Sequence, residues 1–580
     1  MKFVLFSLCV AALSLLGAGR VCAKPVAVPT PGGTIFINVS HAGPTGQVAA
    51  PEAPQNAGFR PPTVFAAPLP TGSGARALGQ AGSFTAVADD ATAASWNPAG
   101  LTQLERTEAS VVYRYSTRTD QHHSPQRDLL TDSDRYSNSE LNYISAVYPF
   151  LLNGCNAVFS LNYQEAYDFT HAFTASFMGG SSWNTVSLQN QTFHKTTTNH
   201  YGDALWNVDV MTHVSTRVES RIDQLLNSSL LTDMEFIQSG TIDAISPAFA
   251  IEPTPRLSMG ATVNFYTDGA SRGNPIRSSL VAEYSGSSTS IAEITETRVS
   301  TADIDWSGVQ IGGPPGRPTS NPISGSETTA PFLDTETYTQ NGMYDARGSY
   351  REENRTESFY GVNATLGILW VATDRLTLGA AMDLPWTGRG EQTKRITDQI
   401  TTVDSNGVQV AQSDYSETQR RDVEYTFPLY WSVGALWRWN DRFYSSMDVS
   451  RTHWSDFSYK AEGEERINPL NGASAASSAI DDCWSVRFGS EYLCVLSWTE
   501  IPLRGGLFWE QRPAIGSPDE YWGATLGSGI SLGKEPGKLI LDVAYSFECG
   551  ENVMGSLLPG QGMTSDTIKH QLFVSAIWHF

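Results

Sequence analysis

The chain has 580 residues and a formal net charge of −22, with 60 acidic residues against 38 Lys and Arg. This acidic excess argues against nucleic acid as a partner, because phosphate backbones bind basic surfaces. Hydrophobic residues make up 40% of the chain, a share that separates an exported soluble protein from a β-barrel only weakly, since barrel strands are apolar at every second position.

The N-terminal residues 1–23 have the parts of a secretory signal peptide. A basic second residue precedes an apolar run from Phe3 to Leu16, and small residues follow up to a cleavage site after Ala23. No later apolar run reaches the about 20 residues that a transmembrane helix needs. Residues 24–71 are rich in Pro, Ala and Gly, and we expect a linker or flexible arm.

The next segment, residues 72–106, consists largely of small residues and turn formers. Its glycines can adopt backbone conformations that are closed to other residues, and its Asp-Asp and Asn-Pro pairs favour tight turns. We predict a compact hatch that plugs something else; the alternative is a Gly/Ala-rich surface loop. The residues expected to hold and gate the hatch are Gly74, Gly79, Gly82, Asp89, Asp90, Asn97, Pro98 and Ala99.

From residue 107 onward, extended segments alternate with turns. Between Leu539 and Glu548 the odd positions are apolar and the even positions are mostly polar. A period of two is the strand period. The fourteen strands predicted in this way cover residues 107–116, 140–150, 155–168, 240–252, 256–268, 357–371, 374–386, 422–437, 442–453, 483–495, 501–511, 519–532, 537–549 and 566–580.

Short and long connections alternate between these strands. The long connections, which we expect to be loops, cover residues 169–239, 269–356, 387–421 and 454–482. Short turns on one side and long loops on the other are typical of outer-membrane barrels, and an even strand count places both termini on the periplasmic side. The predicted fold class is therefore all-β: a transmembrane antiparallel β-barrel of about 14 strands over residues 107–580, with the hatch in its lumen.

The last strand ends on an aromatic residue, with Trp578 and Phe580 on its apolar face. This ending resembles the C-terminal signature of bacterial outer-membrane barrels. It implies the barrel assembly machinery as a partner, and outer-membrane lipid and lipopolysaccharide as surroundings. Aromatic residues near other strand ends predict girdles at the two membrane interfaces. These residues include Tyr148, Phe150, Trp386, Trp437, Trp439, Trp454 and Trp522.

Several stretches resemble the FadL-type family of outer-membrane transporters for hydrophobic compounds. They are residues 74–101, 361–376, 437–457 and 504–510. The resemblance covers most of the chain after residue 72, and the long arm and the inserts at 169–239 and 269–356 depart from it. It implies that ligand is caught at outer loops, moves to a lumen pocket near the hatch, and leaves when the hatch shifts and a break in the third strand opens the wall.

Two segments are candidates for parts of that route. Val214, Val218 and Ile222 recur at helical spacing between charged residues, which predicts an amphipathic helix. This helix is either a structural cap on the barrel mouth or, by the resemblance, an apolar groove for ligand. In the third strand, polar residues interrupt the apolar alternation and are consistent with a kink for lateral opening. These residues are Gln164, Glu165 and Asp168.

We therefore expect an outer-membrane channel for passive uptake of hydrophobic compounds, either long-chain fatty acids or aromatic or aliphatic hydrocarbons. The alternative is a barrel scaffold for assembly or secretion, which the Pro-rich arm favours. We do not expect an enzyme, a metal or a cofactor. The ten histidines show no metal-ligand spacing, and the Gly-x-Ser-x-Gly pattern that begins at Gly269 continues into Asn274-Pro275 rather than into a helix.

Overall fold

The computed structural model describes residues 26–30, 33–37, 67–123, 129–131, 133–202, 206–268, 275–312, 319–497, 499–533, 537–553 and 564–580. The predicted signal peptide, most of the arm and the motif at Gly269 lie outside the described residues. Within the arm, β1 (Val26–Thr30) pairs antiparallel with β2 (Gly33–Ile37). Among the described residues, no helix is long and apolar enough to cross a membrane.

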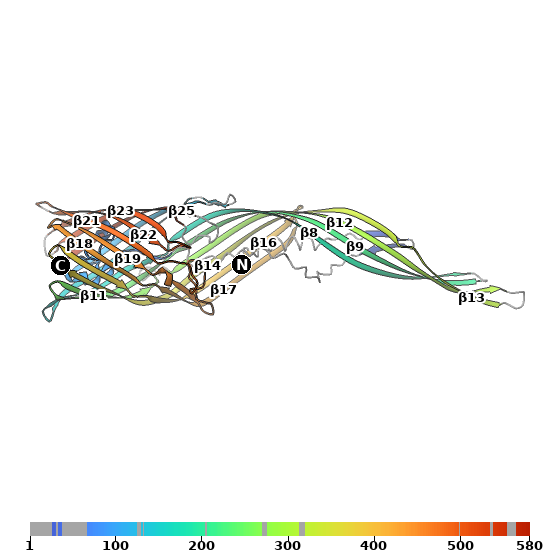
Figure 1. The fold of residues 1–580 in the computed structure, drawn as a ribbon, viewed down its shortest axis with the longest axis horizontal. Coiled ribbons are helices and arrows are strands. Elements are labelled where there is room, and N and C mark those ends of the chain that lie inside the picture. The colour runs from blue at the N-terminus through green and yellow to red at the C-terminus, as the bar shows by residue number, and fades with distance from the viewer. Residues whose placement is uncertain are drawn as a thin grey trace.

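Fourteen antiparallel strands form a closed barrel (Figure 1). The ring consists of β4 (Glu108–His123), β6 (Ser133–Leu152), β7 (Cys155–Asp168), β10 (Thr241–Thr254), β11 (Leu257–Thr267), β14 (Phe332–Val371), β15 (Leu376–Asp383), β18 (Tyr430–Asn440), β19 (Phe443–Thr452), β21 (Cys483–Val495), β22 (Glu500–Arg512), β23 (Asp519–Leu532), β24 (Leu539–Val553) and β25 (Thr564–His579). Pairing between β25 and β4 closes it. Each strand overlaps one of the predicted strands, so the predicted fold class is confirmed.

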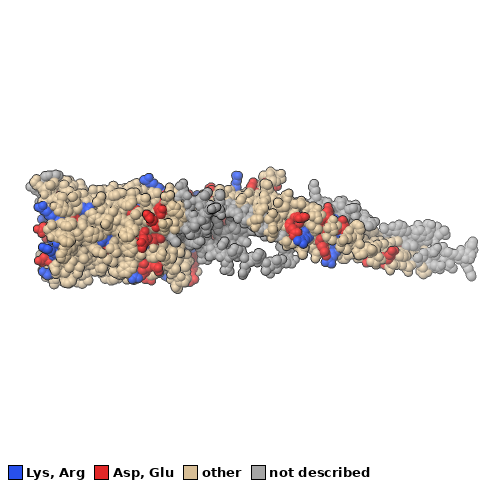
Figure 2. All heavy atoms as spheres, turned by 45° about the horizontal axis from the view of Figure 1, so that its top comes forward, with Lys and Arg blue, Asp and Glu red and all other residues tan. Residues whose placement is uncertain are grey.

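The outer face of the barrel is apolar and the inner face is largely polar. On β24, Leu541 and Val543 are exposed, whereas Asp542 and Ser546 are buried in the lumen. On the face of the barrel that Figure 2 shows, charged side chains gather at one rim and acidic side chains toward the other end, with a mostly uncharged band between them. Apolar residues that face outward at every second position are the pattern of a membrane barrel, because its outer face meets lipid.

The wall continues past one end of the barrel as an open sheet, which we call the extension. It consists of β8 (His171–Gly202), β9 (Trp206–Ser239), β12 (Ile276–Gly312), β13 (Thr319–Thr328), the first half of β14, β16 (Trp386–Asp404) and β17 (Gln409–Phe427). Neighbouring strands of the extension pair in the same order as in the barrel wall. Figure 1 shows it as a twisted ribbon that projects from the end opposite the C terminus.

The prediction that residues 169–239, 269–356 and 387–421 are loops is wrong. Their described residues are mostly long strands, because the barrel ladders continue instead of ending at the rim. Only the connection 454–482 is largely irregular, with η2 (Trp454–Asp456) and the short strand β20 (Ser458–Ala461). β5 (Leu129–Thr131) pairs with β8 at the base of the extension.

The predicted amphipathic helix is wrong as well, since Val214, Val218 and Ile222 lie on β9. A spacing of four is even, so it places residues on one face of a strand as well as on one face of a helix. The charged residues between them decide the matter. Arg217 and Arg221 occupy odd positions and are exposed, while Val218 is buried. Exposed and buried positions therefore alternate with the strand period of two.

Candidate functional site

The hatch lies inside the barrel, and among residues 71–104 only Gln103 is exposed. It contains α2 (Ala75–Gly79), α3 (Ala93–Trp96) and η1 (Pro98–Gln103). Side chains from the wall bind its backbone: Asp448 accepts from the Thr85 amide at 2.8 Å, and the Thr525 hydroxyl accepts from the Ala81 amide at 3.0 Å. The wall therefore holds the hatch by specific hydrogen bonds as well as by packing.

Asn97 joins two parts of the hatch to the wall. Its Nδ2 donates to the carbonyls of Thr85 at 2.7 Å and of Ile368 on β14 at 3.0 Å, and its Oδ1 accepts from the Ala99 amide at 3.2 Å. Its backbone is extended, with φ −152°, as favoured before Pro98. Because Asn97 is fully buried, loss of its amide would remove these three hydrogen bonds at a site that water does not reach.

The two predicted aspartates have different roles. Asp89 forms an ion pair with Arg76 at 3.0 Å, and Arg76 also pairs with Glu491 of β21 at 3.3 Å. Asp90 closes a local turn by accepting from the amide and the hydroxyl of Thr92, at 2.8 Å and 2.6 Å. Asp89 therefore belongs to the connection between hatch and wall, and Asp90 to the folding of the hatch itself.

The hatch glycines have two structural roles: some adopt positive φ, and one allows close approach of the wall. Gly74 and Gly82 have φ values of 86° and 73°, in the left-handed region that side chains disfavour. A Cβ atom on Gly82 would also lie 3.0 Å from Arg487 Nη1. Gly79 instead allows close approach, because a Cβ atom there would lie 3.2 Å from the Cα atom of Gly527 on β23.

A seam lies between β6 and β7, the strands next to the predicted lateral opening. These strands are paired only as far as Tyr143 and Gln164. Beyond that point β7 pairs with β3 (Leu69–Pro70), the chain that leads into the hatch, and the Thr71 amide donates to the Ala166 carbonyl at 3.2 Å. The seam is thus filled by residues that are continuous with the hatch.

The predicted polar residues of the third strand gather at this seam. Arg114 of β4, which is 2% exposed, donates to the Glu165 carboxylate and to Asp168 Oδ2, the latter at 2.8 Å. Gln164 lies beside them and lines the cavity described next. The strand also carries an irregularity in its pairing with β10. Lateral opening itself stays a prediction.

A cavity of about 330 Å³ lies above the hatch. Its lining includes several hatch residues, among them Ala81, Gly82 and Trp96, together with residues of the seam, the barrel wall, the base of the extension and the connection that begins at Trp454. One part of its wall is aromatic and another is charged. It is therefore an amphipathic chamber with the hatch as its floor.

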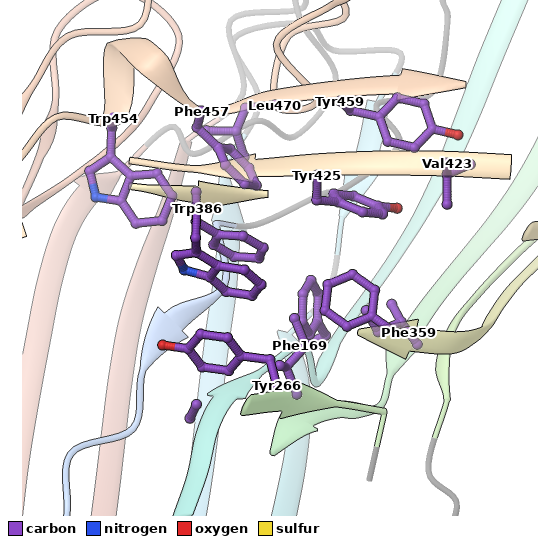
Figure 3. Packing of buried hydrophobic residues seen from close by; sticks show 14 of the residues in the cluster. Phe169, Tyr266, Phe359, Trp386, Val423, Tyr425, Trp454, Phe457, Tyr459 and Leu470 are labelled. Carbon is purple, nitrogen blue, oxygen red and sulfur yellow. The ribbon is translucent and has the colours of Figure 1, made fainter. Parts of the chain in front are cut away.

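The aromatic part is built around Trp386. Its ring stacks on Tyr266, with 3.9 Å between centroids and 13° between planes, and on Phe427, at 4.3 Å and 6°. Phe457 packs against Phe427 at 5.5 Å, and Figure 3 shows rings from separate strands facing one another here. An apolar or aromatic ligand would find matching surface at this wall.

The prediction that Trp386 and Trp454 belong to interface girdles is wrong, because they are only 5% and 3% exposed. Alternation carried on from β15 would place Trp386 outward. The break at Leu384-Pro385 between β15 and β16 resets it. That proline is the signal in the sequence that could have located the cluster.

The charged part is a belt of four bases and two acids. Its members are Arg118, Lys569, Glu548, Arg512, Glu510 and Arg487. Arg512 bridges Glu510 at 2.5 Å and Glu548 at 2.6 Å, and Arg487 pairs with Glu510 at 2.6 Å. Arg118 pairs with Asp120 behind the lining at 2.8 Å, so the three arginines of the belt all have carboxylate partners.

One group of side chains has the order of a hydrolase triad. His122 contacts Ser565 Oγ at 2.7 Å and Asp134 Oδ2 at 2.9 Å. Ser565 is only 4% exposed, and Asp134 also accepts from the amide and hydroxyl of Thr174, both at 2.7 Å. A nucleophile must reach its substrate, so we interpret these contacts as a brace between β4, β6, β8 and β25.

The remaining predicted positions lie away from the cavity. Val214, Val218 and Ile222 lie on β9 in the extension. Trp578 and Phe580 lie at the short-turn end, where their rings stack at 5.9 Å and the Phe580 amide donates to the Thr107 carbonyl at 2.9 Å.

No protein-family model and no curated protein matches the chain. Among solved structures, a FadL homologue from Pseudomonas aeruginosa is 14% identical and covers 89% of this chain and 100% of its own, with a TM-score of 0.44. The toluene transporter TbuX of Ralstonia pickettii is 13% identical over 88% and 98%, with a TM-score of 0.40. The toluene transporter TodX of P. putida is 12% identical over 88% and 99%, with a TM-score of 0.37. The solved structures that the chain resembles thus include FadL-type proteins, but similarity at this level carries no argument about function.

Proposed function

We propose that this protein is an outer-membrane channel for the passive uptake of hydrophobic compounds, either long-chain fatty acids or aromatic or aliphatic hydrocarbons. The observation that carries the proposal is the aromatic-walled cavity directly above the hatch. A water-filled pore suits polar solutes, whereas a barrel with a packed hatch passes only what displaces it. Apolar rings at the cavity wall favour hydrophobic solutes.

The proposed route begins at the end of the barrel that carries the extension. Ligand enters the cavity beside Trp386 and then leaves either past the hatch or through the seam between β6 and β7. Residues 69–71 fill that seam and lead directly into the hatch, so a shift of the hatch would pull them out of the wall. The sequence resemblance of residues 74–101 to FadL-type hatches supports the same route.

Uptake of N-phenyl-1-naphthylamine into proteoliposomes tests the proposal. The wild-type protein should take up this hydrophobic probe with saturation and should exclude a polar dye of similar size. Replacing Trp386 by Ala should raise the half-saturating concentration about 3- to 10-fold, since an aromatic pair is worth about 0.5–1.5 kcal/mol beyond its burial. Trp439→Ala is the matched control, because Trp439 is 55% exposed on the outer face.

Deleting residues 74–101 provides a second test of the hatch. The barrel should still insert, small-ion conductance should rise, and probe uptake should lose its saturation. Wild-type proteoliposomes that take up no more probe than empty liposomes would contradict the channel proposal.

A scaffold without transport is the second candidate, and one observation favours it: the extension projects far beyond the barrel rim (Figure 1). A variant that lacks residues 181–229, the far parts of β8 and β9, separates the two functions. If the protein is a channel, the trimmed barrel keeps saturable probe uptake. If it is a scaffold, trimming removes its cellular role while no variant transports the probe.

A further inference from the structure

The floor of the cavity contains a strained turn at the end of α2. The Ala81 amide donates to the Leu78 carbonyl at 2.9 Å, and the Gly82 amide donates to the Ala77 carbonyl at 2.9 Å. This is a Schellman ending, in which the residue at the position of Ala81 adopts a left-handed conformation and is usually glycine. Here it is alanine, with φ 57° and 1% exposure. Surrounding contacts must therefore hold a conformation that its Cβ atom disfavours.

Arg487 of β21 supplies one of those contacts from the cavity side. Its Nη1 donates to the Ala81 carbonyl at 3.0 Å, and its Nη2 binds Glu510 at 2.6 Å. Its guanidinium carbon lies 5.5 Å from the ring centroid of Phe508. Arg487, Phe508, Glu510 and Ala81 all line the cavity, so one side chain contacts the ligand space, the wall and the strained turn.

We propose that Arg487 is the latch of the hatch: it braces the turn at Ala81 in the empty cavity and releases it when hydrophobic ligand fills the floor. This inference rests on the proposed uptake function. Ligand that packs on Phe508 displaces the guanidinium from the ring and excludes water. The displaced guanidinium stays with the charged Glu510 rather than with the neutral Ala81 carbonyl, because the charge-assisted pair is the stronger of the two contacts. Once its brace is lost, the strained turn relaxes and the hatch loosens.

Single-channel recording in planar bilayers without ligand tests the latch directly. Replacing Arg487 by Met should raise the fraction of time spent in the conducting state about 5- to 30-fold, the factor that corresponds to release of one left-handed alanine. Arg375→Met is the matched control, because Arg375 is exposed on a short turn and does not line the cavity. Its conductance should equal that of the wild type.

A rescue separates a latch from general damage to the barrel. Glycine adopts positive φ without strain, so the turn in Ala81→Gly needs no brace. The double variant with Arg487→Met and Ala81→Gly should therefore return toward the low conductance of the wild type. In the wild type, N-phenyl-1-naphthylamine should raise conductance, whereas in Arg487→Met it should have little further effect.

The outcomes for the latch and for transport are distinguishable. Wild-type conductance in an inserted Arg487→Met variant, or a double variant as conductive as the single one, would overturn the latch even if probe uptake is intact. Conductance that responds as expected while no variant takes up the probe would keep the latch and reject the transport function. If Arg487→Met does not insert, Arg487→Lys is recorded instead, because one ammonium cannot reproduce both guanidinium contacts and should give an intermediate increase.

Discussion

The barrel and the extension have the same backbone ladders but opposite side-chain polarity. In the barrel, aliphatic residues such as Val543 face outward and polar residues such as Asp542 face inward. In the extension, charged residues such as Arg217 face outward while Val218 and Ile294 are buried on the other face. Strand pairing alone therefore does not specify polarity; the medium on the outer side, lipid or water, selects which residues occupy the outward positions.

The largest expected effect is a difference between the two regions when the same change, an outward aliphatic residue replaced by Arg, is made in each. Val543 and Ile291 are matched outward aliphatic residues, 45% and 44% exposed. Val543→Arg should destabilise the inserted barrel by about 2–4 kcal/mol, because it places a charge toward lipid. Ile291→Arg should change stability by less than about 0.5 kcal/mol, since its outward neighbour is water. Urea unfolding followed by the heat-dependent shift in SDS gel migration measures both.

Equal losses of stability in the two variants would contradict the assignment of the extension to water. Equal tolerance would contradict the assignment of the barrel face to lipid. Asp542→Asn is a useful third variant, because it changes an inward position on the same strand without adding charge.

The barrel could be predicted from the sequence because each strand alternates between two different media. In Leu539–Val553 lipid selects apolar residues at the odd positions and the lumen accepts polar ones at the even positions, so the period of two is visible. On β9 neither face of the strand selects apolar or polar side chains as strictly. Ser, Thr and Gln occur on either face, and Val214, Val218 and Ile222, which are spaced by four, fit a helix as well as a strand.

The second prediction concerns the buried carboxylate of Glu352 in the extension. Its Oε1 binds Lys394 Nζ at 2.5 Å, and its Oε2 accepts from the Tyr350 hydroxyl at 2.5 Å. Replacing Glu352 by Gln should destabilise the extension by about 1.5–3 kcal/mol, the value of hydrogen bonds to a charged group. Hydrogen exchange of the β14 and β16 amides reports this loss. The control is Glu353→Gln, which alters the neighbouring outward carboxylate.

The same carboxylate makes the extension sensitive to acid. Burial opposes its charged form, but the Lys394 ammonium and the hydrogen bonds outweigh burial, so the pKa of Glu352 lies below its usual 4.5. A carboxylate whose pKa is lowered on folding stabilises the fold at pH values above its ordinary pKa. That stabilisation is lost as the pH falls through the folded-state pKa. Protection of the β14 amides should therefore decrease as the pH falls below the ordinary pKa of 4.5 in the wild type and change less in Glu352→Gln.

The third prediction separates the strand from the predicted helix at Val218. Val218→Ala should destabilise β9 by about 1.5 kcal/mol, because two buried methyl groups are lost at about 0.8 kcal/mol each. Arg217→Ala, on the outward face, should leave hydrogen exchange of β9 unchanged within error. Similar effects at the two positions would mean that β9 does not bury one face.

The candidate site was less predictable than the barrel because it depends on breaks in the strands. Asn97-Pro98 and the hatch glycines could be identified, since turn residues have local backbone requirements. The stack around Trp386 is only partly encoded locally: Pro385 signals the reset that turns Trp386 inward, but the partners Tyr266 and Phe427 lie far away in the sequence. Arg487 gives no local signal at all, since its role depends on reaching Ala81 across the lumen.

The smallest expected effect lies at the boundary between the two regions. Ser358 has φ 54°, and the pairing of β14 with β16 is irregular between Glu357 and Tyr360. This bulge reverses the alternation: Thr356 is buried on the extension side, and the odd-numbered Phe359 is buried on the barrel side. One strand can thus meet the opposite polarities of water and lipid.

Ser358→Gly should raise the stability of the inserted protein by about 0.5–1 kcal/mol, because glycine adopts positive φ without the strain of a side chain, although it loses more entropy on folding. Urea unfolding at matched lipid composition measures the gain. A loss of stability would mean that the Ser358 side chain, rather than the bulge alone, helps to set the boundary.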